Sequence, residues 1–199
     1  MMNSYWSQRV AETMESLDQE FSQGELAYLA LTSKVELPIR DRLAYSLHRR
    51  FGNDAAVLVS REWKRVDLAV IVGQKPEFLL EAKAMYTFNI WDGYRIEFLN
   101  NVRNDLIKLK NNYSDNSAEK LILVLATDCD ESPRKNFDGT VKYSGHLRKY
   151  DKVRRSENEI YTAAREMFGE FEYFSSGKIA GGRAFGMEAS VYYWLFGPY

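Results

Sequence analysis

The sequence has little of the features that assign a protein to a class at once. A single cysteine, Cys129, excludes an internal disulfide, and the two histidines show no histidine–cysteine spacing typical of a zinc site. No apolar run approaches the roughly 18 residues of a membrane span. The first residues lack the basic and apolar regions of a secretory signal. We therefore expect a soluble, cytoplasmic protein with no membrane partner.

The chain also has no large excess of positive or negative charge, because it contains 27 Lys and Arg residues and 28 Asp and Glu residues. A dedicated nucleic-acid-binding protein more often has a basic balance. The segment 133–155 differs from the rest, with eight basic residues and two aspartates. Such a segment can neutralise phosphates, although solvated loops are often basic too. The candidates for nucleic-acid contact are Lys142, Arg148, Lys149, Lys152, Arg154 and Arg155.

The 199 residues contain no internal repeat or long linker, so we expect one domain with a substantial core. Apolar residues recur at helical or strand spacing in six successive segments. These segments predict a helix, three strands, a second helix and a fourth strand, at 35–51, 55–59, 65–73, 76–85, 95–113 and 120–127. The fold class is therefore α/β (α+β), with a core at about 33–128.

Two extensions flank this predicted core. The N-terminal one, 1–32, has the spacing of an amphipathic helix and a second helical stretch after Gly24. The C-terminal one, 129–199, begins with a polar loop region. It continues with a helix over 156–168, opened by a capping box, then a glycine-rich hairpin at 177–186 and a last strand at 189–196.

Three charged residues occupy inner-strand positions of the core. Side chains alternate between the faces of a strand, and both faces of 65–73 are otherwise apolar, so Asp67 lies where a charge is costly. In the next strand Glu81 and Lys83 share one face, roughly 7 Å apart along the strand. If the two strands pair as a hairpin, Asp67 faces Glu81.

Two carboxylates and one amine on an inner sheet form a coherent hydrolytic site. Hard oxygen ligands suit Mg²⁺ (or Mn²⁺), which can bind a substrate phosphate and activate water. Lys83 could orient that water or stabilise the charge that develops on the phosphate. The alternative is a structural ion-pair network without chemistry.

Asp67, thirteen intervening residues and the tripeptide Glu81-Ala82-Lys83 resemble the PD-(D/E)xK nuclease motif, in restriction-endonuclease-like proteins. The predicted order of elements over 35–127 is that family's core. The resemblance implies a magnesium-dependent endonuclease acting on DNA, with metal held by Asp67, Glu81 and the carbonyl of Ala82, and with Lys83 at the attacking water. Valine precedes Asp67 where the family's name has proline. Many such nucleases are homodimers, and nothing in the sequence decides this.

Glu36 is a candidate fourth group. It falls within the apolar stripe of the helix at 35–51 and so faces the sheet, and the family often carries a metal-binding glutamate on this helix. A second interpretation is a capping box formed by Ser33 and Glu36. For the whole chain, the alternative to a nuclease is an inactive module of the same fold that binds nucleic acid or protein.

Overall fold

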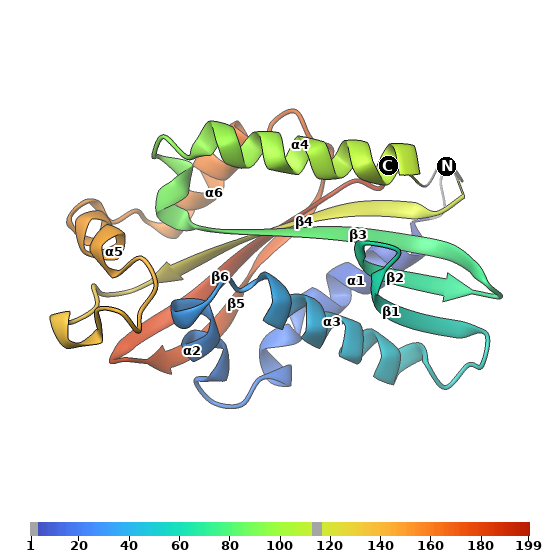
Figure 1. Ribbon diagram of the computed structural model, residues 1–199, viewed down its shortest axis with the longest axis horizontal. Helices are drawn as coiled ribbons and strands as arrows, with labels where there is room; N and C mark the ends of the chain where they lie inside the picture. Colours follow the sequence, from blue (N-terminus) through green and yellow to red (C-terminus); the bar gives the residue numbers. More distant parts are fainter. Residues whose placement is uncertain (1–3, 113–116) are drawn as a thin grey trace.

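A single six-stranded sheet organises the molecule in the computed structural model, which describes residues 4–112 and 117–199 (Figure 1). The order across the sheet is β1-β2-β3-β4-β6-β5. β3 and β4 run parallel, and every other neighbouring pair is antiparallel. The strands are β1 (Val57–Trp63), β2 (Val66–Val72), β3 (Lys75–Tyr86), β4 (Glu119–Cys129), β5 (Tyr173–Ala184) and β6 (Met187–Phe196). The predicted mixed sheet is therefore confirmed.

Six α-helices are found in the described residues, and they cover both faces of the sheet. None of them is long and apolar enough to cross a membrane. Tyr113, where the predicted helix over 95–113 ends, lies outside the described residues. The helices are α1 (Tyr5–Glu15), α2 (Glu25–Thr32), α3 (Glu36–Phe51), α4 (Arg95–Asn112), α5 (Ser144–Tyr150) and α6 (Glu157–Met167).

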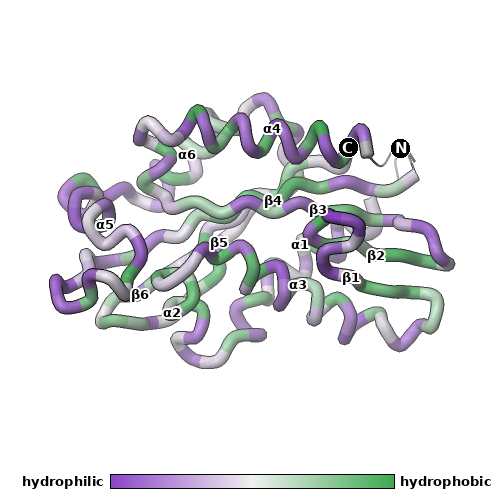
Figure 2. The backbone as a smooth tube through the Cα atoms, in the orientation of Figure 1, coloured by the Kyte–Doolittle hydropathy of each residue, from purple (hydrophilic) through white to green (hydrophobic). Residues whose placement is uncertain are grey.

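The two faces of the sheet bury two separate apolar cores. α1, α2 and α3 pack on one face, whereas α4 and α6 pack on the other. In β2, Leu68 and Val70 belong to the first core, and Ala69 and Ile71 to the second. This alternation confirms the predicted inner strand, and Figure 2 shows β2 as a largely hydrophobic segment.

The order α3-β1-β2-β3-α4-β4 agrees with the predicted order of the core elements. The sequence placed the first strand too early, because β1 begins at Val57 and continues to Trp63. Ser156 caps α6 through the predicted capping box with Glu159. The glycine-rich hairpin is also present, as the end of β5, the turn at Phe185 and Gly186, and the start of β6.

Both predicted extensions contribute to the central structure. β6 pairs with β4 over most of its length, so the C-terminal segment supplies two of the six strands. At the other end, the carboxylate of Glu119 at the start of β4 accepts hydrogen bonds from the backbone N–H groups of Trp6 (2.9 Å) and Ser7 (2.7 Å). These N–H groups have no partner within α1, since they lie in its first turn.

β3 is longer than the strand that pairs with it, and this difference creates the site. The register of β2 with β3 runs from Val72 and Lys75 to Leu68 and Leu80. Beyond Leu80, β3 continues to Tyr86 while β2 has turned away into the β1–β2 turn, so β3 keeps β4 as a neighbour on one side only. The N-terminus of α3 approaches this free part of the β3 edge (Figure 1).

We predict that Glu119→Ala lowers the free energy of unfolding by about 1–3 kcal/mol, because it leaves the first turn of α1 without its acceptor. Urea denaturation followed by circular dichroism measures this loss. Glu131→Ala is the control, since Glu131 is an exposed glutamate outside this contact. Equal stability of the two variants would contradict a role for Glu119 in holding α1.

Candidate active site

Asp67 lies at the point where β2 leaves β3. Its Oδ2 accepts a hydrogen bond from the backbone N–H of Ala82 (2.8 Å), the first free position of the β3 edge. The paired register of β2 with β3 ends at Leu68 and Leu80, one residue short of Asp67 and Glu81, and the charge of Asp67 raises the pKa of Glu81. Asp67 is therefore close enough to Glu81 for its charge to act on that carboxyl group, although the two residues are not partners in the strand register.

Glu36 faces the same region from the first turn of α3. Burial raises the pKa of its carboxyl group, and the charge of Asp67 raises it further, whereas Lys83 and the Ala84 backbone oppose the shift. The capping interpretation of Glu36 is wrong, because the side chain of Ser33 donates to the carbonyl of Leu29 (2.8 Å) instead of capping α3. Glu36 is thus free of a capping role and lies within the electrostatic reach of Asp67.

Lys83 points toward α4. Its Nζ lies 2.9 Å from Oδ2 of Asp105, and the Lys83 side chain is 30% exposed. Burial alone would lower the pKa of Lys83, but the pairing with Asp105 and the charges of Glu36 and Asp67 raise it above the ordinary value. Lys83 is therefore held as a cation, able to donate hydrogen bonds to a water or a phosphate oxygen.

Glu81 is the most deeply buried of the predicted charged residues, with 4% of its side chain exposed. Burial raises the pKa of its carboxyl group to about 7, although an ion pair with Lys108 opposes this shift. Lys108 also donates to the backbone carbonyl of Arg65 (2.5 Å). The side chain of Lys108 is therefore directed from α4 at the carboxylate of Glu81.

Arg40, from the second turn of α3, supplies a further charge. Its side chain is 6% exposed, and Nη1 lies 3.7 Å from Oδ1 of Asp67. The same guanidinium group pairs with Asp41 (2.8 Å) and Glu62 (3.0 Å). Arg40 therefore connects α3 to the end of β1 and holds positive charge beside Asp67.

Arg40 and Asp105 were not predicted as site residues from the sequence, although the spacing of apolar residues around each of them indicates a buried position. Both lie at helical spacing within an apolar stripe: Arg40 between Glu36 and Leu43, and Asp105 between Val102 and Leu109. A charged residue inside such a stripe must find a partner across the helix–sheet boundary. That rule, applied to every helix, points to both residues.

The carboxylates of the site differ in number from those of a metal site built by the protein alone. Among residues 4–112 and 117–199, no group of three or more His, Cys, Asp or Glu side chains is placed so that it could hold a metal ion. Mg²⁺, however, needs only one or two protein carboxylates when waters and substrate phosphates complete its shell. Asp67 and Glu81 are hard oxygen donors, and the charge of Asp67 raises the pKa of Glu81, so the two carboxylates fit this mode of binding.

The six predicted nucleic-acid contacts lie in or near α5, beyond the end of β3 and away from Asp67 (Figure 1). Three of them are paired: Arg148 with Asp138 (2.7 Å), Arg154 with Asp151, and Arg155 with Glu159 (3.3 Å).

The other three predicted contacts are lysines. Lys149 and Lys152 are exposed, and Lys142 lies over the ring of Tyr143, 5.5 Å from its centroid. The structure thus separates this basic group from the carboxylates.

Comparison of the chain with protein-family models, with curated proteins and with solved structures finds no match. The candidate site therefore stands on its own geometry.

We predict a pH dependence of stability that originates at Glu81. Its pKa is raised from 4.5 to about 7, so the folded protein keeps a proton that the unfolded chain loses. The stability that this proton confers is complete below about pH 4.5 and is lost as the pH rises through about 7, a change of about 3 kcal/mol at most.

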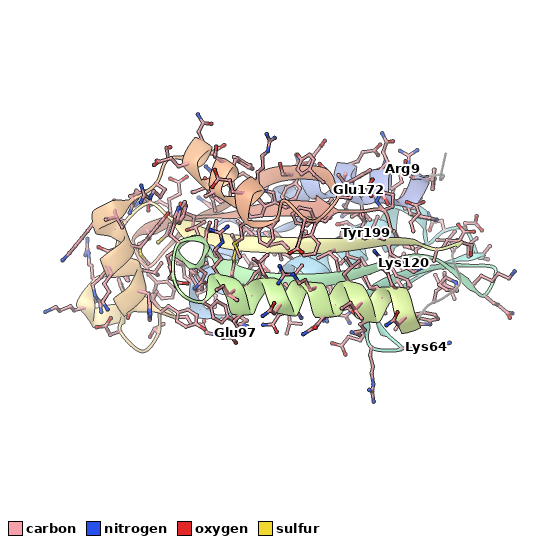
Figure 3. All side chains as sticks on the ribbon, turned by 90° about the horizontal axis from the view of Figure 1, so that it is seen from above. Arg9, Lys64, Glu97, Lys120, Glu172 and Tyr199 are labelled. Atoms are coloured by element: carbon pink, nitrogen blue, oxygen red, sulfur yellow. The ribbon has the colours of Figure 1, made fainter. Side chains whose placement is uncertain are left out.

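Glu81→Gln removes this loss, so the variant gains stability relative to the parent between these pH values and then keeps a constant difference. Thermal and urea unfolding in EDTA from pH 4 to 8 measure the difference. Glu97→Gln, an exposed change on the same side of the sheet, is the control (Figure 3). Parallel pH profiles of the parent and Glu81→Gln would contradict the assignment.

Proposed function

We propose that the protein is a magnesium- or manganese-dependent nuclease that hydrolyses phosphodiester bonds in nucleic acid, with DNA as the expected substrate. The single observation that carries the proposal is the position of Asp67. This carboxylate lies at the end of the β2–β3 pairing, and its charge acts on both Glu36 and Glu81. A cation placed among these groups would relieve their mutual repulsion.

The proposed roles follow from the chemistry of each side chain. Asp67, Glu81 and the carbonyl of Ala82 would hold the metal, with Glu36 completing the acidic wall. When bound, Mg²⁺ would polarise the scissile phosphate and lower the pKa of a water. Lys83, fixed by Asp105, would donate to the attacking water or to the phosphate.

The reaction balances as a simple hydrolysis. The oxygen of one water bonds to phosphorus, the phosphorus–oxygen ester bond breaks, and the leaving oxygen takes up a proton. One product ends in a phosphate and the other in a hydroxyl group. No electron transfer or co-substrate is needed.

Lys108 has a place in this proposal as a positioning residue. Its ion pair with Glu81 neutralises a carboxylate that would otherwise be buried with Asp67 and without a cation. Metal binding would release Lys108, whose side chain is 31% exposed, toward solvent or a substrate phosphate. The restriction-endonuclease-like assignment of the core rests on the order of elements and on these residues.

The basic group at α5 supports a substrate that extends beyond the site. Exposed Lys149 and Lys152 could neutralise phosphates along a strand that leaves the site past the end of β3. An inactive module of the same fold would use this surface too, but would have no requirement for Asp67.

We predict cleavage of plasmid, linear or single-stranded DNA, or of RNA, in Mg²⁺ or Mn²⁺, and a loss on the order of 100-fold or more in Asp67→Asn and Lys83→Met. Gel assays with end-labelled substrates measure the rates. Asp54→Asn in the loop between α3 and β1, and Lys75→Met at the start of β3, are exposed changes that serve as matched controls. An absence of cleavage in every substrate, or full activity of Asp67→Asn, would sink the proposal.

A second prediction separates a metal site from a structural ion-pair network. Lys108→Met removes the cation that competes at Glu81, so the affinity for Mn²⁺ should rise on the order of tenfold. Titration calorimetry at pH 8 measures it, with Lys110→Met on the same helix as the control. If the residues serve only as ion pairs, neither protein binds Mn²⁺ and Lys108→Met loses stability by stranding Glu81.

A further inference from the structure

A cavity of about 270 Å³ opens beside the proposed metal site, at the end of β3. Five of its twelve lining residues have aromatic rings: Tyr86, Phe88, Tyr94, Tyr143 and His146. Three residues, Lys34, Ala84 and Tyr94, line both this cavity and the hollow that contains Glu36, Lys83 and Asp105. The aromatic cavity therefore adjoins the part of the site that contains Glu36 and Lys83.

Three of the aromatic rings, those of Tyr86, Phe88 and His146, form a continuous stack. Phe88 stacks on His146, with centroids 5.5 Å apart and planes 16° apart, and Tyr86 stacks on Phe88 at 5.3 Å and 19°. Tyr143 stands edge-on to Tyr86, at 78°. Tyr86 and Phe88 are buried, whereas His146 is exposed and Tyr143 is 44% exposed, so the cavity has a fixed inner wall and an open rim.

Polar groups meet the aromatic wall at two places. The side chain of Asn89 donates to Asp92 (3.0 Å) and accepts from the backbone N–H of Tyr86 (2.9 Å), which fixes both groups in the lining. A carboxylate has acceptor sites for several donors, so Asp92 can also accept from amino or ring N–H groups. Lys34 is exposed in the wall that the two spaces share, where a phosphate would pass.

We propose that this cavity binds one unstacked nucleobase of the substrate, the base next to the phosphate at Asp67 and Glu81. A cavity with aromatic side chains in its lining and the Asp92 carboxylate at one side matches a base with its ring faces and its amino and ring N–H groups. Lys34, between the two spaces, matches the connecting phosphate. This inference rests on the proposed nuclease function, and it names the class of substrate: single-stranded or locally opened nucleic acid, because a base inside a duplex cannot enter.

The test is the affinity for a short, labelled single-stranded oligonucleotide and for a strand of equal length without bases, measured by fluorescence anisotropy in EDTA and in Ca²⁺. The parent protein should bind the strand with bases more tightly. Tyr143→Asn and His146→Ala should each weaken that binding by roughly 5- to 100-fold, and should leave binding of the baseless strand unchanged. Tyr143→Phe, which keeps the ring, should restore the parent affinity.

The choice of asparagine protects the test against a folding failure. Tyr143 has a left-handed backbone, with φ 55°, which asparagine adopts more readily than most residues. Tyr45→Asn is the matched control, because Tyr45 is a 56% exposed tyrosine on α3 outside the cavity. Melting temperatures of all variants verify folding.

The outcomes separate this inference from the nuclease function. Equal affinity of the parent for strands with and without bases, or an unchanged affinity in both Tyr143→Asn and His146→Ala, overturns the base site. If cleavage still depends on Asp67 in that case, the proposed hydrolysis stands without it. Base-dependent binding that is lost in Tyr143→Asn, together with no cleavage in any metal, supports the base site and overturns the hydrolysis.

Discussion

The hydrogen bond from the backbone N–H of Ala82 to Asp67 is the contact on which the site depends. A buried strand that outlasts its neighbour exposes N–H groups with no partner, and each unsatisfied group costs free energy. At this edge the acceptor is a side-chain carboxylate. The end of the β2–β3 ladder therefore places negative charge inside the protein, at a position set by the lengths of the two strands.

Three ion pairs surround the carboxylate of Asp67 and its neighbour Glu81. Arg40 lies beside Asp67, Lys108 pairs with Glu81, and Asp105 pairs with Lys83. Each pair joins a strand to a helix packed on one face of the sheet. Breaking one pair by removal of a single partner costs about 3–5 kcal/mol in a buried setting. The same network thus fixes α3 and α4 to the sheet and holds the carboxylates close together. The consequence is the raised pKa of the Glu81 carboxyl group.

Much of the core could be predicted from the sequence because the signals there are local. Alternation of apolar residues locates β2 and β3, and with them the two carboxylates Asp67 and Glu81, whose charges interact in the structure. The partners of these residues lie on helices far along the chain, and no local pattern pairs Lys108 with Glu81 or Lys83 with Asp105. The position of β6 beside β4 is also set by tertiary packing. A strand of that composition, seen alone, fits an edge as well as the middle of a sheet.

The strand β6 pairs with β4 but is synthesised much later, and this order has a consequence for folding during translation. β4 is apolar on both faces and has β3 as its only neighbour until residues 187–196 have been synthesised. During translation the other edge of β4 has unpaired backbone N–H and C=O groups, which can pair with an unpaired strand of another chain. Quality control by chaperones on the ribosome would therefore be most needed in the interval between β4 and β6, and a chain terminated within that interval would be a candidate for aggregation.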